Sequence, residues 1–224
     1  FARKLQLNKV YTIAILLPEE MPYWKSYKAG FLEASQEFAS MGIEGKEFYV
    51  GHGEEDAVYS VITQDSFKEA DAVVLAPGLL HADGKSLLYL KEKEIPFVFL
   101  DSSLENAGNA TFIGQDAFQS GRVAGELLKI KYHNDYCVFV ITLTKEDHEN
   151  HTIQERIRGL EDYFSKSVIP VEKRNLMMDD LSLEDLIVQM KRISNEVHVF
   201  IPNSRSYLIV EDLVQLGNDL QFKI

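Results

Sequence analysis

The sequence of 224 residues contains one cysteine, Cys137, and no apolar run long enough to cross a membrane. A single cysteine excludes an intramolecular disulfide, so nothing in the composition indicates an oxidising compartment. A spanning helix needs about 20 consecutive apolar residues, which the chain lacks. Cys137 lies in the apolar run 136–141 and is expected to be a small buried hydrophobic residue of a strand rather than a reactive thiol.

Basic residues are also scarce, since 23 Lys and Arg face 35 Asp and Glu, for a formal net charge of −12. Such a surface repels a phosphate backbone, so we expect any DNA contact to come from a part of the protein outside this chain. Residues 1–8 lack the apolar core of a signal peptide and an initiator methionine. We therefore expect the chain to be a fragment.

Sequence motifs of the common nucleotide-binding and hydrolytic enzymes are absent. The chain has no GxxxxGK[ST], no GxGxxG after the first expected strand, no GxSxG and no HExxH. Residues 18–22, Pro-Glu-Glu-Met-Pro, are too bulky to surround a pyrophosphate with backbone N–H groups. The sequence therefore predicts a protein that is not an enzyme and carries no cofactor.

The densest group of potential metal ligands lies in a short polar stretch: Glu146, Asp147, His148, Glu149 and His151. Their spacing does not require a metal, so a solvated loop without metal is expected. Adjacent carboxylates such as Glu19 and Glu20 could act as general acid and base, but side chains of this kind on one loop usually face water.

Apolar runs of strand length alternate with segments of helical period. Residues 10–17 are rich in β-branched side chains and end before Pro18. Between residues 23 and 40 apolar side chains recur every three or four positions, which is the stripe of an amphipathic helix. The first half is expected to have strands at 10–17, 47–50, 72–76, 97–100 and 111–113, and helices at 23–40, 57–69 and 85–94.

The second half repeats this alternation. Ser182 with Asp185 indicates a helix N-cap and Gly217 a helix end. Strands are expected at 136–142, 168–171, 197–201 and 221–224, and helices at 152–165, 182–193 and 204–216. The pattern predicts an α/β fold of two lobes, each a parallel sheet flanked by helices, with ligands bound at the carboxyl ends of the strands.

Seven segments resemble motifs of LacI-family transcription regulators, in the same order. Residues 1–18 resemble the junction of the hinge helix, typically ending "ARSL", with the first core strand. The others are Met21-Pro22-Tyr23-Trp24 with Gly30 for "NPFF…G", 70–77 for "vDGiIlaP", 95–101 for "iPvVliD", 114–124 for "vDN…G…A", 156–159 for "R..G" and 200–203 for "faaND". Met21, Gln115-Asp116 and Ser204 depart from these motifs.

The resemblance implies a two-lobed periplasmic-binding-protein-like (type I) fold. Residues 1–8 would be a hinge-helix remnant, 9–116 the N-terminal lobe and 117–224 the C-terminal lobe, incomplete at its C-terminal end. A small-molecule effector, expected to be a carbohydrate, would bind between the lobes and change operator affinity. The partners implied are operator DNA, contacted by a helix-turn-helix outside this chain, and a second copy in a homodimer. The location implied is cytoplasmic, without a membrane.

Two alternatives remain open. A periplasmic sugar-binding protein of a transporter would share the fold and the cleft, but would lack the hinge remnant at residues 2–5. A Rossmann-like enzyme would carry a metal, a phosphate cofactor or a coupled histidine–carboxylate pair in a concave site.

A sugar-like ligand needs an aromatic platform and several hydrogen-bonding groups. Trp24 and Tyr23 are candidates for the platform, although Tyr23 also fits the start of the buried helical stripe, which Trp24 does not. Phe118 is a candidate for the opposite wall or for ordinary packing. Asp101 is expected either to accept hydroxyl hydrogen bonds or to cap the following loop. Asp116 is expected to act with Asp101.

Two further candidates lie in the second half. The resemblance places a ligand-binding arginine at Arg156, whereas a surface ion pair with Glu155 or Glu161 is the alternative; Arg158 is expected to point elsewhere. Asn203 is expected to pair its amide with a ligand hydroxyl, or to be the N-cap of a helix beginning at Ser204.

Overall fold

The computed structural model describes residues 9–19, 22–51, 57–76, 84–102, 110–130, 136–204, 206–217 and 221–223, of which Glu146, Glu149 and 221–223 are described by their backbone alone. The chain divides into two compact units, Phe1–Gly114 and Gln115–Ile224. No helix within the described ranges is both long and apolar enough to span a membrane. The hinge remnant expected at residues 1–8 lies outside the described residues.

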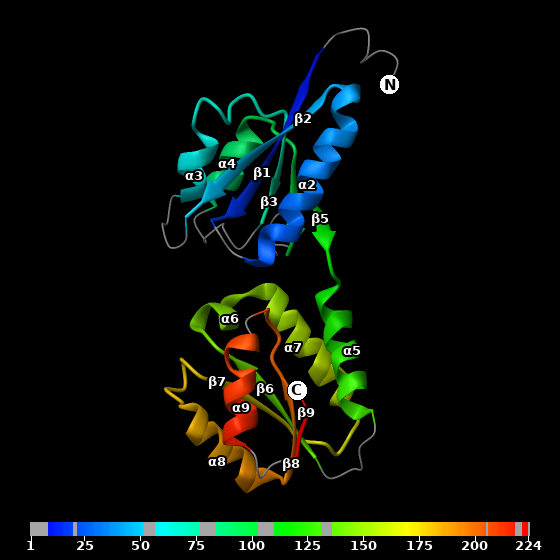
Figure 1. The fold of residues 1–224 in the computed structure, drawn as a ribbon, viewed down its shortest axis with the longest axis vertical. Coiled ribbons are helices and arrows are strands. Elements are labelled where there is room, and N and C mark those ends of the chain that lie inside the picture. Colours follow the sequence, from blue (N-terminus) through cyan, green and yellow to red (C-terminus); the bar gives the residue numbers. More distant parts are fainter. Residues whose placement is uncertain are drawn as a thin grey trace. The chain divides into compact units, whose positions relative to one another are not determined.

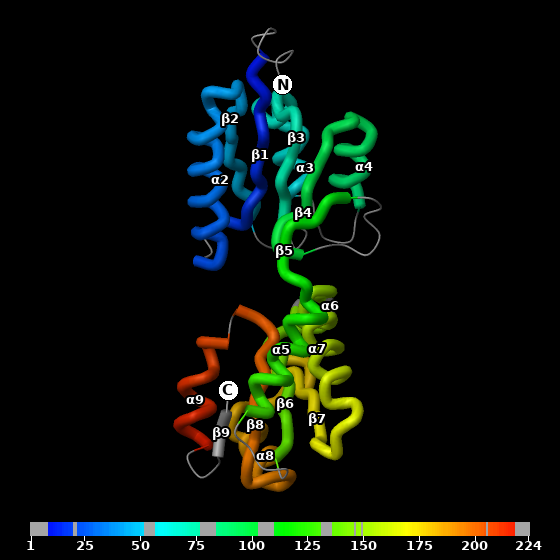
Figure 2. The backbone as a smooth tube through the Cα atoms, turned by 90° about the vertical axis from the view of Figure 1, so that its right-hand side faces the viewer, coloured from blue at the N-terminus to red at the C-terminus, as the bar shows by residue number. Residues whose placement is uncertain are grey.

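The first unit contains a five-stranded sheet, entirely parallel, in the order β2-β1-β3-β4-β5 (Figure 1). Its strands are β1 (Tyr11–Pro18), β2 (Ile43–Val50), β3 (Ala72–Leu75), β4 (Phe97–Asp101) and β5 (Thr111–Gly114). Its helices are α2 (Lys25–Phe38), α3 (Ala57–Ile62) and α4 (Lys85–Glu92), with 3-10 turns η1 (Pro22–Trp24) and η2 (Ala39–Met41) at the two ends of α2. Helix α2 covers one face of the sheet and α3 and α4 cover the other (Figure 2).

Strand β1 is the centre of this unit because both of its faces are covered. Leu16 and Leu17 are 0% and 1% exposed although they point to opposite faces. Burying one such side chain stabilises the fold by about 1.5–3 kcal/mol. The strand therefore reads as a continuous apolar run, as buried parallel strands do.

The second unit contains a four-stranded parallel sheet in the order β7-β6-β8-β9. Its strands are β6 (Cys137–Thr142), β7 (Val171–Asn175), β8 (Glu196–Phe200) and β9 (Gln221–Lys223). Its helices are α5 (Ala117–Lys129), α6 (Lys145–Glu149), α7 (His151–Phe164), α8 (Leu183–Ile193) and α9 (Val210–Leu216), and a 3-10 turn, η4 (Ser206–Leu208), precedes α9.

Alternate residues of β6 belong to two separate cores. Phe139 and Ile141 pack with α8 and α9, while Val138 and Val140 pack with α5 and α7. Cys137 is fully buried at the start of this strand, which confirms its expected role as a small core residue.

The α/β class with parallel, helix-covered sheets is confirmed, but several predicted elements have other bounds. Helix α5 and the short helix α6 were not expected. The strand predicted at 168–171 lies at Val171–Asn175, and β2 begins four residues earlier than predicted. The helices predicted at 57–69 and 204–216 cover only Ala57–Ile62 and Val210–Leu216.

Candidate functional site

Asp101 is the last residue of β4 and accepts hydrogen bonds from two tyrosines, Tyr23 in the turn η1 and Tyr27 in α2. The hydroxyl of Tyr23 donates to Oδ1 of Asp101, and the hydroxyl of Tyr27 donates to the same oxygen at 3.1 Å. Burial and the bond to Asp101 raise the pKa of Tyr23, so it remains a protonated donor. The φ angle of Asp101 is +73°, a left-handed conformation that non-glycine residues adopt at some cost.

An aromatic cluster surrounds this carboxylate. The ring of Trp24 lies 5.1 Å from the rings of both Tyr23 and Tyr27, edge-on to the first. Trp24 is half-buried and packs against the core of its unit, whereas Tyr23 is 37% exposed and precedes α2. The interpretation of Tyr23 as the start of a buried stripe with Trp24 outside it was wrong. The 3-10 turn before α2 changes the angular spacing, so helical periodicity does not apply there.

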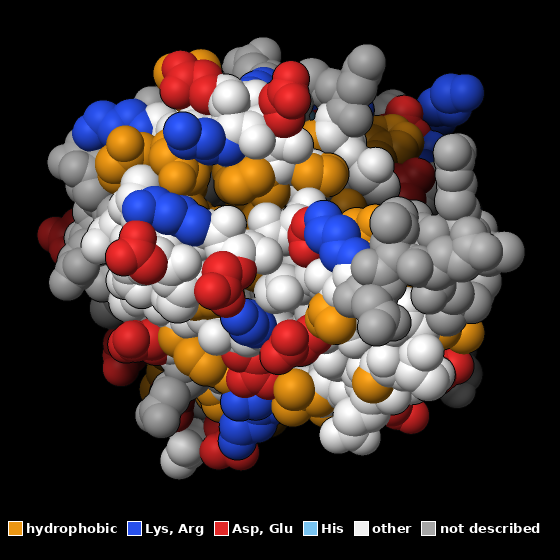
Figure 3. Space-filling model, turned by 90° about the horizontal axis from the view of Figure 1, so that it is seen from above, with side chains coloured by type: hydrophobic (Ala, Val, Ile, Leu, Met, Phe, Trp, Pro, Cys, Tyr) orange, Lys and Arg blue, Asp and Glu red, His pale blue; other side chains and the backbone are white. Residues whose placement is uncertain are grey.

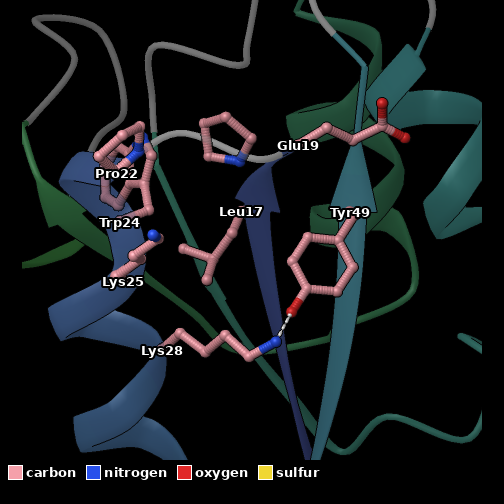
Figure 4. A pocket seen from close by; sticks show the side chains of 8 residues that line it. Leu17, Glu19, Pro22, Trp24, Lys25, Lys28 and Tyr49 are labelled. Carbon is pink, nitrogen blue, oxygen red and sulfur yellow. Dashed lines mark hydrogen bonds between the residues drawn. The ribbon is translucent and has the colours of Figure 1, made fainter.

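Beside Trp24 lies an open pocket of about 880 Å³ at the carboxyl end of β1 (Figure 4). Its lining comes from β1, the segment after it, the start of α2 and the end of β2: Leu17, Pro18, Glu19, Pro22, Trp24, Lys25, Lys28 and Tyr49. Of these residues only Trp24 was a predicted site residue. The rule that ligands bind beyond the carboxyl ends of parallel strands indicates this place, but the alternation of strands and helices does not say which side chains of α2 face it.

Lys28, Glu47 and Tyr49 form a charged group along one wall of this pocket. Nζ of Lys28 lies 3.0 Å from Oε2 of Glu47 and donates to the hydroxyl of Tyr49 at 2.5 Å (Figure 4). These two hydrogen bonds raise the pKa of Lys28. Burial opposes the ionisation of Glu47, but the bonds from Tyr49 and Lys28 outweigh it and lower the pKa of that carboxyl.

In the second unit, Asp147 organises the carboxyl end of the sheet. Asp147 is 1% exposed, and its carboxylate accepts hydrogen bonds from the backbone N–H groups of Leu143 and Thr144 at 2.9 and 3.1 Å. The same oxygen accepts Nδ2 of Asn203 at 2.8 Å. The hydroxyl of Thr144 in turn accepts the N–H of Asp147, completing a capping box at the start of α6. Asn203 is thus held by Asp147, and the alternative of an N-cap is wrong because α9 begins only at Val210.

A smaller pocket of about 220 Å³ opens beside this network, at the ends of β6 and β7. The residues that line it are Val140, Thr142, His148, Gln154, Ile157, Lys173, Arg174, Asn175, Met178 and Asp179. Asn175 is 8% exposed and donates to Oγ1 of Thr142 and to the carbonyl of Thr144, both at 2.9 Å. Within the described part of the chain, no three His, Cys, Asp or Glu residues are grouped so as to hold a metal ion.

Arg156 lies in the second turn of α7 and donates Nη1 to the carbonyl of Pro202 at 3.0 Å. The alternative ion pairs are formed by other residues, because Glu155 pairs with Arg158 at 2.8 Å and Glu161 with Lys173 at 2.6 Å. The bond to Pro202 connects α7 to the segment after β8, which also carries Asn203.

The remaining two predicted residues lie at the start of α5. Asp116 is exposed and is the N-cap of that helix, since its Oδ1 accepts the N–H of Gln119 at 2.9 Å. Phe118 is half-buried beneath Arg158, whose guanidinium carbon lies 5.2 Å from the ring centre. The predicted residues Asp101, Tyr23 and Trp24 are therefore grouped in the first unit. In the second unit, Arg156 binds the carbonyl of Pro202, which is the residue next to Asn203.

The end of the molecule at which β1 begins is seen in Figure 3. Its described acidic and basic side chains are interspersed around apolar ones, and they form no continuous basic area among the residues drawn in colour.

Several solved structures are similar to the whole chain. A putative LacI transcriptional regulator from Bacteroides fragilis is 22% identical, with a TM-score of 0.71 over 96% of this chain and 77% of that one. A glucose-galactose binding protein from Geobacillus stearothermophilus is 17% identical, with a TM-score of 0.69 over 94% and 75%. The Caulobacter myo-inositol binding protein, solved with myo-inositol, is 15% identical, with a TM-score of 0.68 over 93% and 71%.

These likenesses support the same fold for all four chains. No curated protein sequence matches this one. The sequence profile of the family described as the periplasmic binding protein domain, however, matches residues 13–214. The chain therefore belongs to the periplasmic binding protein domain family.

Proposed function

We propose that the chain is the ligand-binding core of a LacI-type transcription regulator, which binds a small sugar-like molecule and changes operator affinity. The observation that carries the proposal of a sugar is the group formed by Asp101, Tyr23 and Trp24 at the carboxyl end of the first sheet. A carboxylate beside the exposed ring of Tyr23 and the half-buried ring of Trp24 offers a strong acceptor for hydroxyl groups and a flat surface for the C–H face of a sugar ring.

The tyrosine hydroxyls at Asp101 stand in for ligand hydroxyls in this state of the protein. Both tyrosines donate to Oδ1, so Oδ2 retains its acceptor capacity for a ligand. Tyr27, which was not among the predicted site residues, positions the carboxylate; its place on the apolar stripe of α2 concealed this role.

Arg156 and Asn203 are proposed as ligand-binding residues of the second unit, with Phe118 and Asp116 as further contacts. Arg156 is held by the carbonyl of Pro202, and Asn203 by Asp147, so both side chains are oriented before any ligand arrives. Such pre-organisation reduces the entropy lost on binding.

In the proposed mechanism, the ligand favours one arrangement of the two units over another and so shifts a population. A helix-turn-helix outside this chain would contact operator DNA, and two copies would form a dimer. Coupling between effector and DNA of about 1–3 kcal/mol is typical of such systems. The likeness to the Bacteroides fragilis regulator and the resemblance of residues 1–8 to a hinge junction support this proposal.

A solute-binding protein of a sugar transporter is the second candidate. It is favoured by similar structures of sugar-transport proteins, such as that of a periplasmic ribose ABC transporter from Conexibacter woesei. The sequence encoded before Phe1 separates the two candidates. A basic helix-turn-helix supports the regulator, whereas a secretory leader supports the transporter protein and contradicts the regulator.

The sugar-binding proposal is tested by a thermal-shift screen of the chain against mono- and oligosaccharides, with nucleobases as a contrasting class. A ligand at about 100 times its Kd adds about 2.7 kcal/mol of stability, which raises Tm by several degrees. Asp101→Asn is the variant of choice because asparagine tolerates the left-handed backbone at this position, whereas alanine adds strain. We expect Asp101→Asn and Arg156→Ala to abolish the shift.

The matched control is Asp65→Asn, which changes a carboxylate whose side chain is 97% exposed. This variant should keep the full ligand shift. A panel in which no sugar raises Tm, or a sugar shift that survives in both Asp101→Asn and Arg156→Ala, would contradict the proposed site.

A further inference from the structure

The pocket beside Trp24 contains two lysines on the same side of α2. Lys25 and Lys28 are three positions apart, so they lie next to each other on the helix surface, and both line the pocket. Figure 4 shows both side chains at the wall formed by α2. A neutral sugar requires neither ammonium group.

The position of these lysines is unfavourable for the helix alone. Cations near a helix N-terminus interact badly with the macrodipole, and like charges at this spacing repel each other, each by a few tenths of a kcal/mol or more. The first turn of α2 contains no acidic residue, and the N-cap residue, Trp24, makes no side-chain hydrogen bond to the helix. The first turn of α2 therefore contributes positive charge to the pocket, and Glu47 of β2 offsets the charge of Lys28.

The two lysines differ in how they are held. Lys28 is bound by Glu47 and Tyr49, and an ammonium has three protons, so one remains for a further acceptor. Lys25 is exposed and forms no ion pair with another residue in the described ranges. Lys28 is thus held by two partners, whereas Lys25 has no ion-pair partner among the residues that the structure describes.

Among the described residues that line the pocket, Glu19 is the acidic one, and its carboxylate is turned away from the lysines. Figure 4 shows it pointing outward, past the end of β2. Its Oε2 lies 3.9 Å from the place where a Cβ of Gly51 would stand. The carboxylate therefore does not occupy the space between the lysines and Leu17.

We propose that this pocket binds the acidic group of the ligand, a carboxylate or a phosphate, so that the effector is an acidic sugar rather than a neutral one. The inference rests on the proposed function, in which the hydroxyl groups of the same ligand are bound at Asp101. Trp24 connects the pocket with the group around Asp101, because it lines the pocket and its ring contacts those of Tyr23 and Tyr27, which bind Asp101. Lys25 and Lys28 are specificity-determining residues in this proposal.

The experiment is isothermal titration calorimetry of the chain with matched pairs of probes. D-glucuronate and D-galacturonate are compared with D-glucose and D-galactose, and hexose 6-phosphates with the same neutral hexoses. We expect at least tenfold tighter binding of one acidic member than of its neutral counterpart, and a loss of this preference on raising the salt concentration from about 0.05 M to 0.5 M. The carboxylate and phosphate arms distinguish the two kinds of acid.

Two variants test whether the preference for acidic probes arises from the lysines of the pocket. Lys25→Gln should remove most of the difference in affinity between acidic and neutral probes. Lys28→Arg keeps the charge and the contact with Glu47 and should retain the preference. The control is Lys68→Gln, which alters an exposed lysine paired with Asp65 in the same unit and should have no effect.

The outcomes separate this inference from the proposed function. If neutral sugars bind and acidic ones bind no tighter, or if Lys25→Gln keeps the acid preference, the inference is overturned and the sugar-binding proposal stands. If neither kind of sugar binds, the proposed function itself fails.

Discussion

Gly121 of α5 lies directly against the backbone of Arg156 in α7. A Cβ atom built on Gly121 would stand 1.9 Å from the Arg156 carbonyl oxygen, which is far inside van der Waals contact. The contact has a counterpart in the other direction, because a Cβ on Gly159 would stand 1.9 Å from the carbonyl oxygen of Phe118. The two helices touch backbone to backbone, and this crossing fixes the turn of α7 that carries Arg156.

Gly121→Ala is expected to destabilise the second unit. The added methyl group meets backbone atoms of α7, which cannot move aside as a flexible side chain would, and overpacking of this kind costs about 1–3 kcal/mol or more. Thermal unfolding followed by circular dichroism should show a lower Tm. Gly159→Ala should act in the same direction.

The control for this prediction is Gly30→Ala in the middle of α2. A Cβ on Gly30 meets nothing within 4 Å, so the substitution only improves helix propensity and should stabilise by about 0.5–1 kcal/mol. A wild-type Tm for Gly121→Ala would show that the helices do not pack this closely in solution.

The close packing of α5 against α7 also explains why the sequence did not predict a helix at α5. Its buried residues are Gly121, Gly125 and Leu128, two of which have no side chain. Its large apolar residues Val123 and Leu127 are instead 57% and 55% exposed. Gly121 packs against the backbone of α7 and Gly125 against the side chain of Tyr163, so two buried positions of α5 carry no apolar side chain for a prediction to count.

Two of the edge strands, β2 and β7, were predicted with wrong bounds for a related reason. The prediction took the apolar cluster at 168–171 as a strand, but Val168 is 91% exposed and the strand that follows, β7, contains Glu172, Lys173 and Arg174. Edge strands tolerate charged residues because one side has no neighbouring strand. The buried central strands β1 and β6 were predicted within a residue or two, since burial on both faces requires continuous apolar sequence.

The candidate site was predictable only in part. Asp101 was predicted as a site residue because it ends a strand, and the structure shows that Tyr23 and Tyr27 donate hydrogen bonds to it. The lysines of the pocket and the role of Asp147 depend on which side of a helix faces the strand ends, which one sequence without its fold does not specify.

Asp147→Ala is expected to destabilise the carboxyl end of the second sheet. It removes three part-buried hydrogen bonds to one carboxylate oxygen, from the N–H groups of Leu143 and Thr144 and from Nδ2 of Asn203, a loss of about 2–3 kcal/mol by comparison with other caps and hydrogen bonds to charged groups. Urea unfolding gives the free energy. Asp162→Ala, which breaks only an exposed ion pair with Arg122, should cost less than about 1 kcal/mol; equal losses in the two variants would contradict the role of Asp147.

Cys137 is expected to be inert towards alkylating reagents in the folded chain. It is 0% exposed, and burial raises the pKa of its thiol to about 11, so the reactive thiolate is nearly absent at pH 7. Mass spectrometry after treatment with iodoacetamide should show no adduct under native conditions and one adduct in guanidinium chloride. Rapid modification of the native chain would mean that β6 opens readily.

The free energy of unfolding of the first unit is expected to fall at acidic pH because the Asp71 carboxylate becomes protonated. The hydrogen bond from Lys9 at 2.9 Å lowers the pKa of the Asp71 carboxyl, helped by the N–H of Thr12 and opposed by burial. A carboxyl with a lowered pKa in the folded state contributes its full stability above its ordinary pKa, because both states are then ionised. Below that pH the unfolded chain takes up the proton first, and the contribution is lost as the pH falls through the folded pKa.

Asp71→Asn should therefore flatten the decline of unfolding free energy between about pH 5 and pH 2, measured by urea titration at each pH. Lys9→Met removes the largest cause of the shift and should flatten the decline in the same way. If the variants retain the wild-type slope, the bond between Lys9 and Asp71 is not populated in solution.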